Sequence, residues 1–262
     1  MAIQKQTQKI YLGCDLGQAN DFTALVLMEH VRFVDVPDTV RSADQAPPNL
    51  DMREANEVSA AHDEYHVRYI ERMRGISYED VKGRIRDLIN HVRTQTGRAP
   101  ILILDASGVG RPIVDSLRDL SPVAVTVHGG ANTNHEQGSW RVPKRDLVGA
   151  AKVVLGKGQL KIAKVRYADT LANELQNFRV KVNINTGHDS FEAWREGDHD
   201  DLVFALSLCC WYCLRMQKRA GHMILPIEIG KGSYAADQTR VSAMRESEKG
   251  GRWAGLTGFR SG

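Results

Sequence analysis

Carboxylates stand at three points of the sequence where a folded chain would be burying apolar side chains. Asp15 ends the apolar run "YLGCD", Asp105 ends "ILILD", and Asp200 and Asp201 open the apolar run "LVFALSL". Carboxylates held close together raise one another's pKa, and an unpaired buried carboxylate is costly. A cluster of them therefore predicts a divalent cation, and Mg²⁺ or Mn²⁺ suits oxygen ligands of this kind. Two such ions, roughly 3.5–4 Å apart, can hold the attacking and leaving oxygens of a phosphodiester.

Each acid also has a purely structural interpretation. Asp15 could hydrogen-bond the turn "GQAN" that follows it. Asp105 could be a turn residue, or could face a ligand where the strand order of a sheet changes direction. Asp200 or Asp201 could cap a helix, where the helix dipole favours an acid. Taken together, the three positions favour metal chemistry over three unrelated local roles.

The elements that would position these acids follow from hydrophobic periodicity. Apolar runs predict two strands at residues 9–16 and 22–34, joined by the tight turn "GQAND", and a third strand at "EYHVRYIERM". The spacing in "SYEDVKGRIRDLINHVRTQ" predicts a helix with Ser77 as its N-cap. "ILILD" reads as a buried central strand, "RPIVDSLRDL" as a helix and "SPVAVTVHGG" as another strand.

Three further helices and a hairpin are predicted in the second half of the chain. The helices are "VPKRDLVGAAKVVLG", "YADTLANELQNF" and the long segment that begins "HDDLVFALSL", while "FRVKVNINTGHDSFEAW" has the alternation and turn residues of a β-hairpin. Three consecutive strands followed by strand–helix–strand units indicate an α/β fold, with a mixed central sheet flanked by helices.

Composition limits the class of protein. The 262 residues and formal net charge of +3 suit a globular protein without a strong overall field. We expect one domain over residues 1–222 and a flexible C-terminal tail over 223–262, which has few aliphatic residues. The four cysteines (Cys14, Cys209, Cys210 and Cys213) lack the paired spacing of a zinc site and read as small buried hydrophobic residues in a reducing cytosol. No signal peptide or membrane-spanning run is visible, which predicts a cytoplasmic protein without a membrane partner.

Five segments together resemble a known family. "YLGCDLGQANDFTALVLME", "ILILDASGVGRPIVDSL", "VPKRDLVGAAKVVLGKGQLKIA", "TLANELQNFRVKV" and "DHDDLVFALSLCCWY" resemble, in this order, the nuclease domain of the large terminase subunit of tailed bacteriophages. The resemblance covers roughly residues 9–216. It implies a ribonuclease H-like fold, in which the first strand lies at the centre of the sheet and its acid meets an acid on the neighbouring strand.

The resemblance also implies an activity and roles for the acids. The chain would be an endonuclease that cleaves double-stranded DNA with little sequence preference during viral genome packaging, in the cytoplasm of the host cell. Asp15 would be the ligand shared by two Mg²⁺ or Mn²⁺ ions, Asp105 would hold one of them, and Asp200 would be the third ligand with Asp201 beside it. Which of these two adjacent acids leads is left open. The implied partners are DNA, the terminase ATPase domain or subunit, the portal and the small terminase subunit.

Basic residues provide candidate contacts to the DNA backbone. Arg141, Lys144 and Arg145 lie near the start of a predicted helix, whose amides also favour anions, and Arg179 and Lys181 alternate along the predicted hairpin. We expect the hairpin to border the active cleft. No base-reading motif is visible, so binding should depend steeply on salt.

The sequence departs from a complete large terminase and leaves other functions open. It has no G-x-x-x-x-G-K-[ST] motif, so we expect no DNA translocation by this chain alone, which would be an excised domain or a separately encoded nuclease. A RuvC-like junction resolvase would use the same acids. An actin-like or sugar-kinase-like ATPase would use "DLGQANDFTALV" as a phosphate loop, and a non-catalytic DNA-binding module would need none of the acids.

Overall fold

A nine-stranded mixed sheet runs through the computed structural model, which describes residues 2–17, 21–36, 62–107, 111–182, 200–219 and 245–246. The strand order is β6-β7-β5-β4-β1-β2-β3-β8-β9, so β1 lies at the centre. The strands are β1 (Ala2–Asp15), β2 (Phe22–Val36), β3 (His62–Arg74), β4 (Ile101–Asp105), β5 (Val123–His128), β6 (Asn134–Glu136), β7 (Ser139–Pro143), β8 (Leu160–Ala163) and β9 (Arg245–Glu246). The α/β class with a mixed sheet is thereby confirmed.

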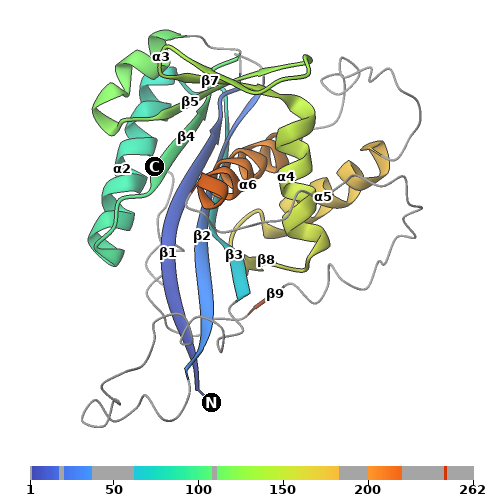
Figure 1. Cartoon of the computed structure of the whole chain (residues 1–262). Helices are drawn as coiled ribbons and strands as arrows, with labels where there is room; N and C mark the ends of the chain where they lie inside the picture. Colours follow the sequence, from blue (N-terminus) through green and yellow to red (C-terminus); the bar gives the residue numbers. More distant parts are fainter. Residues whose placement is uncertain are drawn as a thin grey trace.

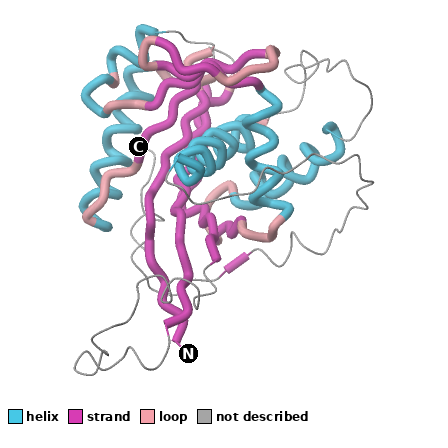
Figure 2. The backbone as a smooth tube through the Cα atoms, viewed as in Figure 1, coloured by secondary structure: helices cyan, strands magenta, loops and turns pink. Residues whose placement is uncertain are grey.

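The sheet combines an antiparallel half with a parallel half. β1, β2 and β3 are antiparallel neighbours, whereas β4 runs parallel to β1, β5 parallel to β4 and β7 parallel to β5. β1 and β2 are the long strands, and they extend past the helices toward the N-terminus (Figure 2). The carboxyl ends of β1, β4, β5 and β7 therefore share one edge of the sheet, where ligands of α/β proteins commonly bind.

Helices cover both faces of the sheet (Figure 1). α2 (Tyr78–Thr96) and α3 (Arg111–Ser116) lie on one face, and a short 3₁₀ turn (Arg118–Leu120) follows α3. α4 (Lys144–Gly156), α5 (Ala168–Val182) and α6 (Asp201–Arg219) lie on the other face. In the described part of the chain, no helix has the length and apolar character needed to cross a membrane.

α2 forms as its sequence predicts. The Ser77 hydroxyl accepts a hydrogen bond from the Asp80 amide at 3.1 Å, and Gly97 ends the helix in the left-handed region with φ of 70°. One face of the helix is buried against the sheet and consists of Val81, Ile85, Leu88, Ile89 and Val92. The 3.6-residue spacing of these side chains is what allows a single stripe to meet the core.

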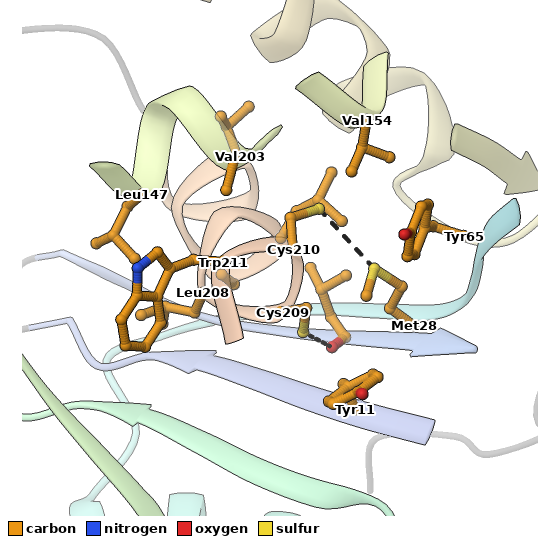
Figure 3. Close-up of a cluster of buried hydrophobic side chains, with 14 of the residues drawn as sticks. Tyr11, Met28, Tyr65, Leu147, Val154, Val203, Leu208, Cys209, Cys210 and Trp211 are labelled. Atoms are coloured by element: carbon orange, nitrogen blue, oxygen red, sulfur yellow. Dashed lines mark hydrogen bonds between the residues drawn. The ribbon is translucent and has the colours of Figure 1, made fainter. Parts of the chain in front are cut away.

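α6 is the buried helix of the opposite layer, and it lies close to β1 (Figure 3). A Cβ atom placed on Gly13 would come within 2.0 Å of the Ala205 carbonyl oxygen, so only glycine permits this approach. The Cys209 thiol lies 3.7 Å from the Val26 carbonyl oxygen. All four cysteines are buried and free, which confirms their interpretation as small core residues.

One predicted element is wrong where it can be compared. The hairpin predicted over residues 178–194 begins as helix, because α5 continues to Val182. Leu171 and Leu175 bury one face of α5 in the core with α6, and extending an existing helix adds one hydrogen bond per residue, whereas a new strand needs a partner. The rest of that prediction, residues 183–194, lies outside the described residues, as does the expected domain boundary at residue 222.

Candidate functional site at the carboxyl edge of the sheet

Asp15 and Asp105 end adjacent parallel strands at the same level. Cys14 of β1 is paired with Leu104 of β4, and the two acids are the next residue of each strand. Neighbouring strands lie about 4.8 Å apart, so the two backbones bring the carboxylates into one neighbourhood. Burial raises the pKa of the Cys14 thiol, and the negative charges of Asp15 and Asp105 raise it further. Both carboxylates thus act on the same buried sulfur.

Strand alternation places both carboxylates on the face of the sheet that α6 covers. Tyr11 and Ile103, which precede the two acids by four and two positions, are buried in the core with α6. Ala24 pairs with Asp15 across β1 and β2 and belongs to the same core. The side chains of Asp15 and Asp105 therefore lie on the face that packs against α6, at the carboxyl ends of β1 and β4.

The first turn of α6 approaches the same edge. Ala205 lies over Gly13, and the ring of Tyr212 lies 6.4 Å from that of Tyr11, so α6 runs antiparallel to β1. The helix therefore starts on the Asp15 side of Gly13. The Asp200 carbonyl oxygen accepts the first helical hydrogen bond from the amide of Phe204 at 2.9 Å.

Asp201 forms an ion pair with Arg72 of β3. The Arg72 Nη2 atom lies 2.9 Å from Asp201 Oδ2, and the guanidinium also lies 3.9 Å from the centre of the Phe22 ring. Arg72 pairs with Ala24 in the register of β2 and β3. Asp105, Asp15, Ala24 and Arg72 therefore lie at one level on the adjacent strands β4, β1, β2 and β3. The first residue of α6 contacts Arg72, at the β3 side of this row.

Glu174 of α5 is a buried acid at this site that the sequence interpretation missed. Its Oε2 atom accepts hydrogen bonds from the amides of Leu202 and Val203, each at 3.2 Å. Burial raises the pKa of Glu174 to about 7, although the Val203 amide and Arg72 lower it, and Asp201 and Asp200 raise it again. The available signal was an acid inside the helical apolar stripe of "LANEL", which is unusual for a surface helix.

Asp105 is fixed by the turn that follows it. Its Oδ1 atom accepts hydrogen bonds from the Ser107 amide at 2.8 Å and from the Ser107 hydroxyl at 2.5 Å. The same hydroxyl oxygen accepts the amide of Val127 on β5 at 2.7 Å. The sequence "DAS" is therefore a local turn that holds one carboxylate oxygen of Asp105, as the structural interpretation of this acid expected.

The turn after Asp15 is held in a similar way. The Gly17 amide donates to the Thr23 hydroxyl at 3.1 Å, and the Tyr78 hydroxyl donates to the Gly17 carbonyl at 3.3 Å. A Cβ atom on Gly17 would lie 2.5 Å from the Phe22 carbonyl oxygen, so this tight turn requires glycine. The chain is thus restrained immediately beyond the first acid.

The predicted DNA-contacting residues are divided among three elements, β7, α4 and α5. Arg141 is exposed on β7 between Trp140 and Val142, which are both buried with α6, so its side chain lies on the opposite face. Lys144 and Arg145 begin α4 at the carboxyl edge, and Arg145 Nη2 donates to the Ala131 carbonyl at 2.5 Å.

The two remaining basic candidates belong to a helix rather than a hairpin. Arg179 and Lys181 lie in the last turns of α5, and their side chains are outside the described residues. Their predicted alternation on a strand is therefore replaced by helical spacing, and the five basic candidates do not share one face.

The donor chemistry of this edge fits a divalent cation, although the acids do not form a complete cage. Among the described residues, no three Asp, Glu, His or Cys side chains form a group that could hold a metal ion. Mg²⁺ commonly uses one or two carboxylates together with waters and substrate phosphates, and the adjacent acids Asp15 and Asp105 offer such a pair. Asp200 directly precedes the first residue of α6 and is half-buried.

Comparisons of the chain with protein-family models, curated proteins and solved structures gave no match.

Proposed function

We propose that the chain is a metal-dependent endonuclease that hydrolyses phosphodiester bonds of double-stranded DNA on a ribonuclease H-like fold. The observation that carries the proposal is the placement of Asp15 and Asp105 side by side at the ends of β1 and β4. The central position of β1 in the sheet also agrees with the fold that the sequence resemblance implies. By the same resemblance, the substrate would be a viral genome cut during packaging in the host cytoplasm.

The residues of the chain have distinct roles in this proposal. Asp15 and Asp105 would hold Mg²⁺ or Mn²⁺, with a third carboxylate from the start of α6. Two bound ions would lower the pKa of the attacking water and stabilise the leaving 3′ oxygen. The chain itself fixes the acids: Ser107 orients Asp105, and the restrained turn at Gly17 follows Asp15. Pre-oriented groups of this kind contribute much of the rate of an enzyme, because they need no rearrangement during reaction.

Binding to DNA would use the phosphate backbone. Lys144 and Arg145 lie at the N-terminus of α4, where backbone amides add to the attraction for phosphate. This contact is independent of base sequence, which agrees with little sequence preference. The ATPase domain or subunit, the portal and the small terminase subunit remain the proposed protein partners.

Plasmid cleavage in Mn²⁺ or Mg²⁺ tests this function directly. We expect nicked and linear DNA from the wild-type chain, and a loss of at least about 100-fold in rate in both Asp15→Asn and Asp105→Asn, as is usual when a charge-stabilising group is removed. Asp119→Asn is the matched control, because Asp119 is an exposed acid paired with Arg86 beyond α3. Activity that survives both active-site substitutions would contradict the proposal.

Two additional substrates separate the alternatives. A four-way DNA junction cleaved in preference to linear duplex would identify a junction resolvase using the same acids. ATP hydrolysis in the absence of DNA would instead favour an actin-like or sugar-kinase-like ATPase.

A further inference from the structure

The segment that joins β3 to α2 exposes two large apolar side chains to solvent. Ile76 is 41% exposed and Tyr78 is 39% exposed, and no other large hydrophobic side chain among the described residues is as exposed. Arg74, the last residue of β3, is exposed as well, and Gly75 turns the chain after it in the left-handed region with φ of 69°. We call Arg74, Ile76 and Tyr78 the β3–α2 corner. Exposed apolar side chains grouped beside a charge are typical of an interaction site.

The β3–α2 corner lies at the same edge of the sheet as the first acid. β1 and β3 are both antiparallel to β2, so they run in the same direction and end at the same edge. In the strand register Asp15 is level with Arg72, so Arg74 lies two residues beyond the level of the acid. The Tyr78 hydroxyl donates to the carbonyl oxygen of Gly17, two residues after Asp15, at 3.3 Å. The corner therefore borders the turn that follows Asp15.

The Arg74 side chain lies on the same face of the sheet as the acids. Phe22 pairs with Arg74 across β2 and β3, and Arg74 Cζ lies 5.3 Å from the centre of the Phe22 ring. Phe22 precedes Ala24 by two residues, and Ala24 is buried in the core with α6, so strand alternation places the ring and the guanidinium on the α6 side. The ring attracts the guanidinium by a cation–π interaction. An exposed guanidinium held beyond the acids in this way is well placed to bind a phosphate.

Basic side chains thus stand on both sides of the acids along this edge. The strand order is β7-β5-β4-β1-β2-β3, with Lys144 and Arg145 following the end of β7 and Arg74 at the end of β3. Asp105 and Asp15 end the strands between them, β4 and β1. Neighbouring strands are about 4.8 Å apart, so β7 and β3 are separated by about 24 Å. This distance is the length of about seven base pairs, and a duplex laid along the edge would meet both basic groups across the acids.

We propose that the β3–α2 corner is a second DNA contact of the chain, in which Arg74 binds a backbone phosphate and Ile76 and Tyr78 pack into the adjacent minor groove. The inference rests on the proposed nuclease and adds a contact on the β3 side of Asp15, opposite the contact at the start of α4. Apolar side chains that meet the minor groove are common among proteins that hold duplex DNA by its shape. Contacts on both sides hold the duplex across the acids.

The phosphate contact is tested by the salt dependence of duplex binding, measured by fluorescence anisotropy on the whole chain in EDTA to prevent metal-dependent cleavage. Arg74→Ala should lower the slope of log K against log salt by about 1, and Arg74→Lys should keep the wild-type slope because it keeps the charge. Arg93→Ala is the matched control, because Arg93 is exposed in the last turn of α2, about 22 Å along the helix from Tyr78. An unchanged slope in Arg74→Ala would overturn the phosphate contact.

The apolar part of the contact is tested by affinity at constant salt. Ile76→Ala combined with Tyr78→Ala should weaken duplex binding by about tenfold and leave the slope unchanged, because apolar side chains release no counterions. Tyr78→Phe is the control: it removes the hydroxyl that donates to Gly17 but keeps the exposed ring, so it should bind as wild type does. Wild-type affinity in the double variant, or an equal loss in Tyr78→Phe, would overturn the apolar contact.

Cleavage assays on the same variants distinguish the corner contact from the nuclease itself. We expect Arg74→Ala to raise KM for DNA by about threefold to tenfold while kcat stays within about twofold, because the residue binds DNA away from the reacting bond. Asp15-dependent cleavage with wild-type KM in Arg74→Ala and in the double variant would refute the corner contact alone. Duplex binding that depends on the corner, in a chain that cuts no DNA with Mn²⁺, would refute the nuclease and leave the contact standing. A wild-type chain that binds no duplex would refute both.

Discussion

At the residue scale, the two strand-end acids follow from the sequence, but the buried charged groups around the start of α6 do not. Asp15 and Asp105 could be found because each interrupts an apolar strand, and parallel strands bring their carboxyl ends to one edge. Glu174 and Arg72 were missed because their partners on α6 are distant in sequence: 28 residues separate Glu174 from Leu202, and 129 separate Arg72 from Asp201. No local pattern reports contacts of that kind.

Removal of the Ser107 hydroxyl should loosen Asp105. Ser107→Ala loses a side-chain hydrogen bond to Asp105 Oδ1 and one from the Val127 amide. We expect the dissociation constant for Mn²⁺ to rise about tenfold in calorimetry, as for loss of an outer-shell partner. Ser116→Ala is the control, because its hydroxyl donates within α3, to the Ile113 carbonyl, and not to an acid of the site. Unchanged Mn²⁺ affinity in Ser107→Ala would show that the turn does not orient the acid.

Glu174 should make stability depend on pH. Burial raises its pKa from 4.5 to about 7, so the folded state favours the protonated form. The associated stability is present below about pH 4.5 and is lost as pH rises through 7. We therefore compare the free energies of unfolding of wild type and Glu174→Gln. The value for wild type minus the value for the variant should fall by on the order of 2 kcal/mol between about pH 5 and 8. Urea denaturation at each pH measures this difference, and a constant value would contradict a buried titrating carboxylate.

At the element scale, the apolar periodicities predicted the central strands and most helices, and failed where two patterns competed. "FRVKV" alternates as a strand does, but it continues a helix whose leucines are already buried on α6. The close contact of α6 with β1 could not be predicted from the sequence either, because a glycine such as Gly13 within a strand can mark a bulge as well as a close helix contact. The strand positions could be predicted because each buries a continuous apolar run.

Gly13→Ala should disrupt the contact that brings α6 to the acids. The added Cβ would lie 2.0 Å from a backbone oxygen of α6, which cannot move without displacing the helix. We expect a loss of on the order of 3 kcal/mol in unfolding free energy, the upper range for overpacking. Gly83→Ala on α2 is the matched control: its Cβ meets nothing within 4 Å, and it should stabilise the protein by roughly 0.5–1 kcal/mol. Equal stability of Gly13→Ala and wild type would refute the close helix–strand contact.

At the scale of the whole molecule, one sheet edge gathers the acids, the start of α6 and the start of α4. The predicted mixed sheet is confirmed, with β1 central. The basic residues are less well predicted, because a pattern of charges does not say which face of a strand is exposed: Arg141 projects from the face opposite the acids. Among the basic candidates, Lys144 and Arg145 at the start of α4 therefore have the stronger claim to contact DNA.

Removal of these two charges should reduce the salt dependence of DNA binding. In the plot of log K against log salt, each lost phosphate contact lowers the slope by about 1, so Lys144→Ala with Arg145→Ala should lower it by about 2. Arg118→Ala, whose side chain is 79% exposed beside Asp115, is the control and should leave the slope unchanged. Fluorescence anisotropy with duplex DNA at several salt concentrations measures the slope. An unchanged slope in the double variant would show that Lys144 and Arg145 do not contact the DNA phosphates.

The most direct test of the central claim is an anomalous difference map from crystals of the whole chain soaked in Mn²⁺. We expect a manganese peak between the carboxylates of Asp15 and Asp105, with Asp201 still bound to Arg72. Carboxylates that diverge with no manganese between them, in crystals that otherwise diffract well, would contradict it.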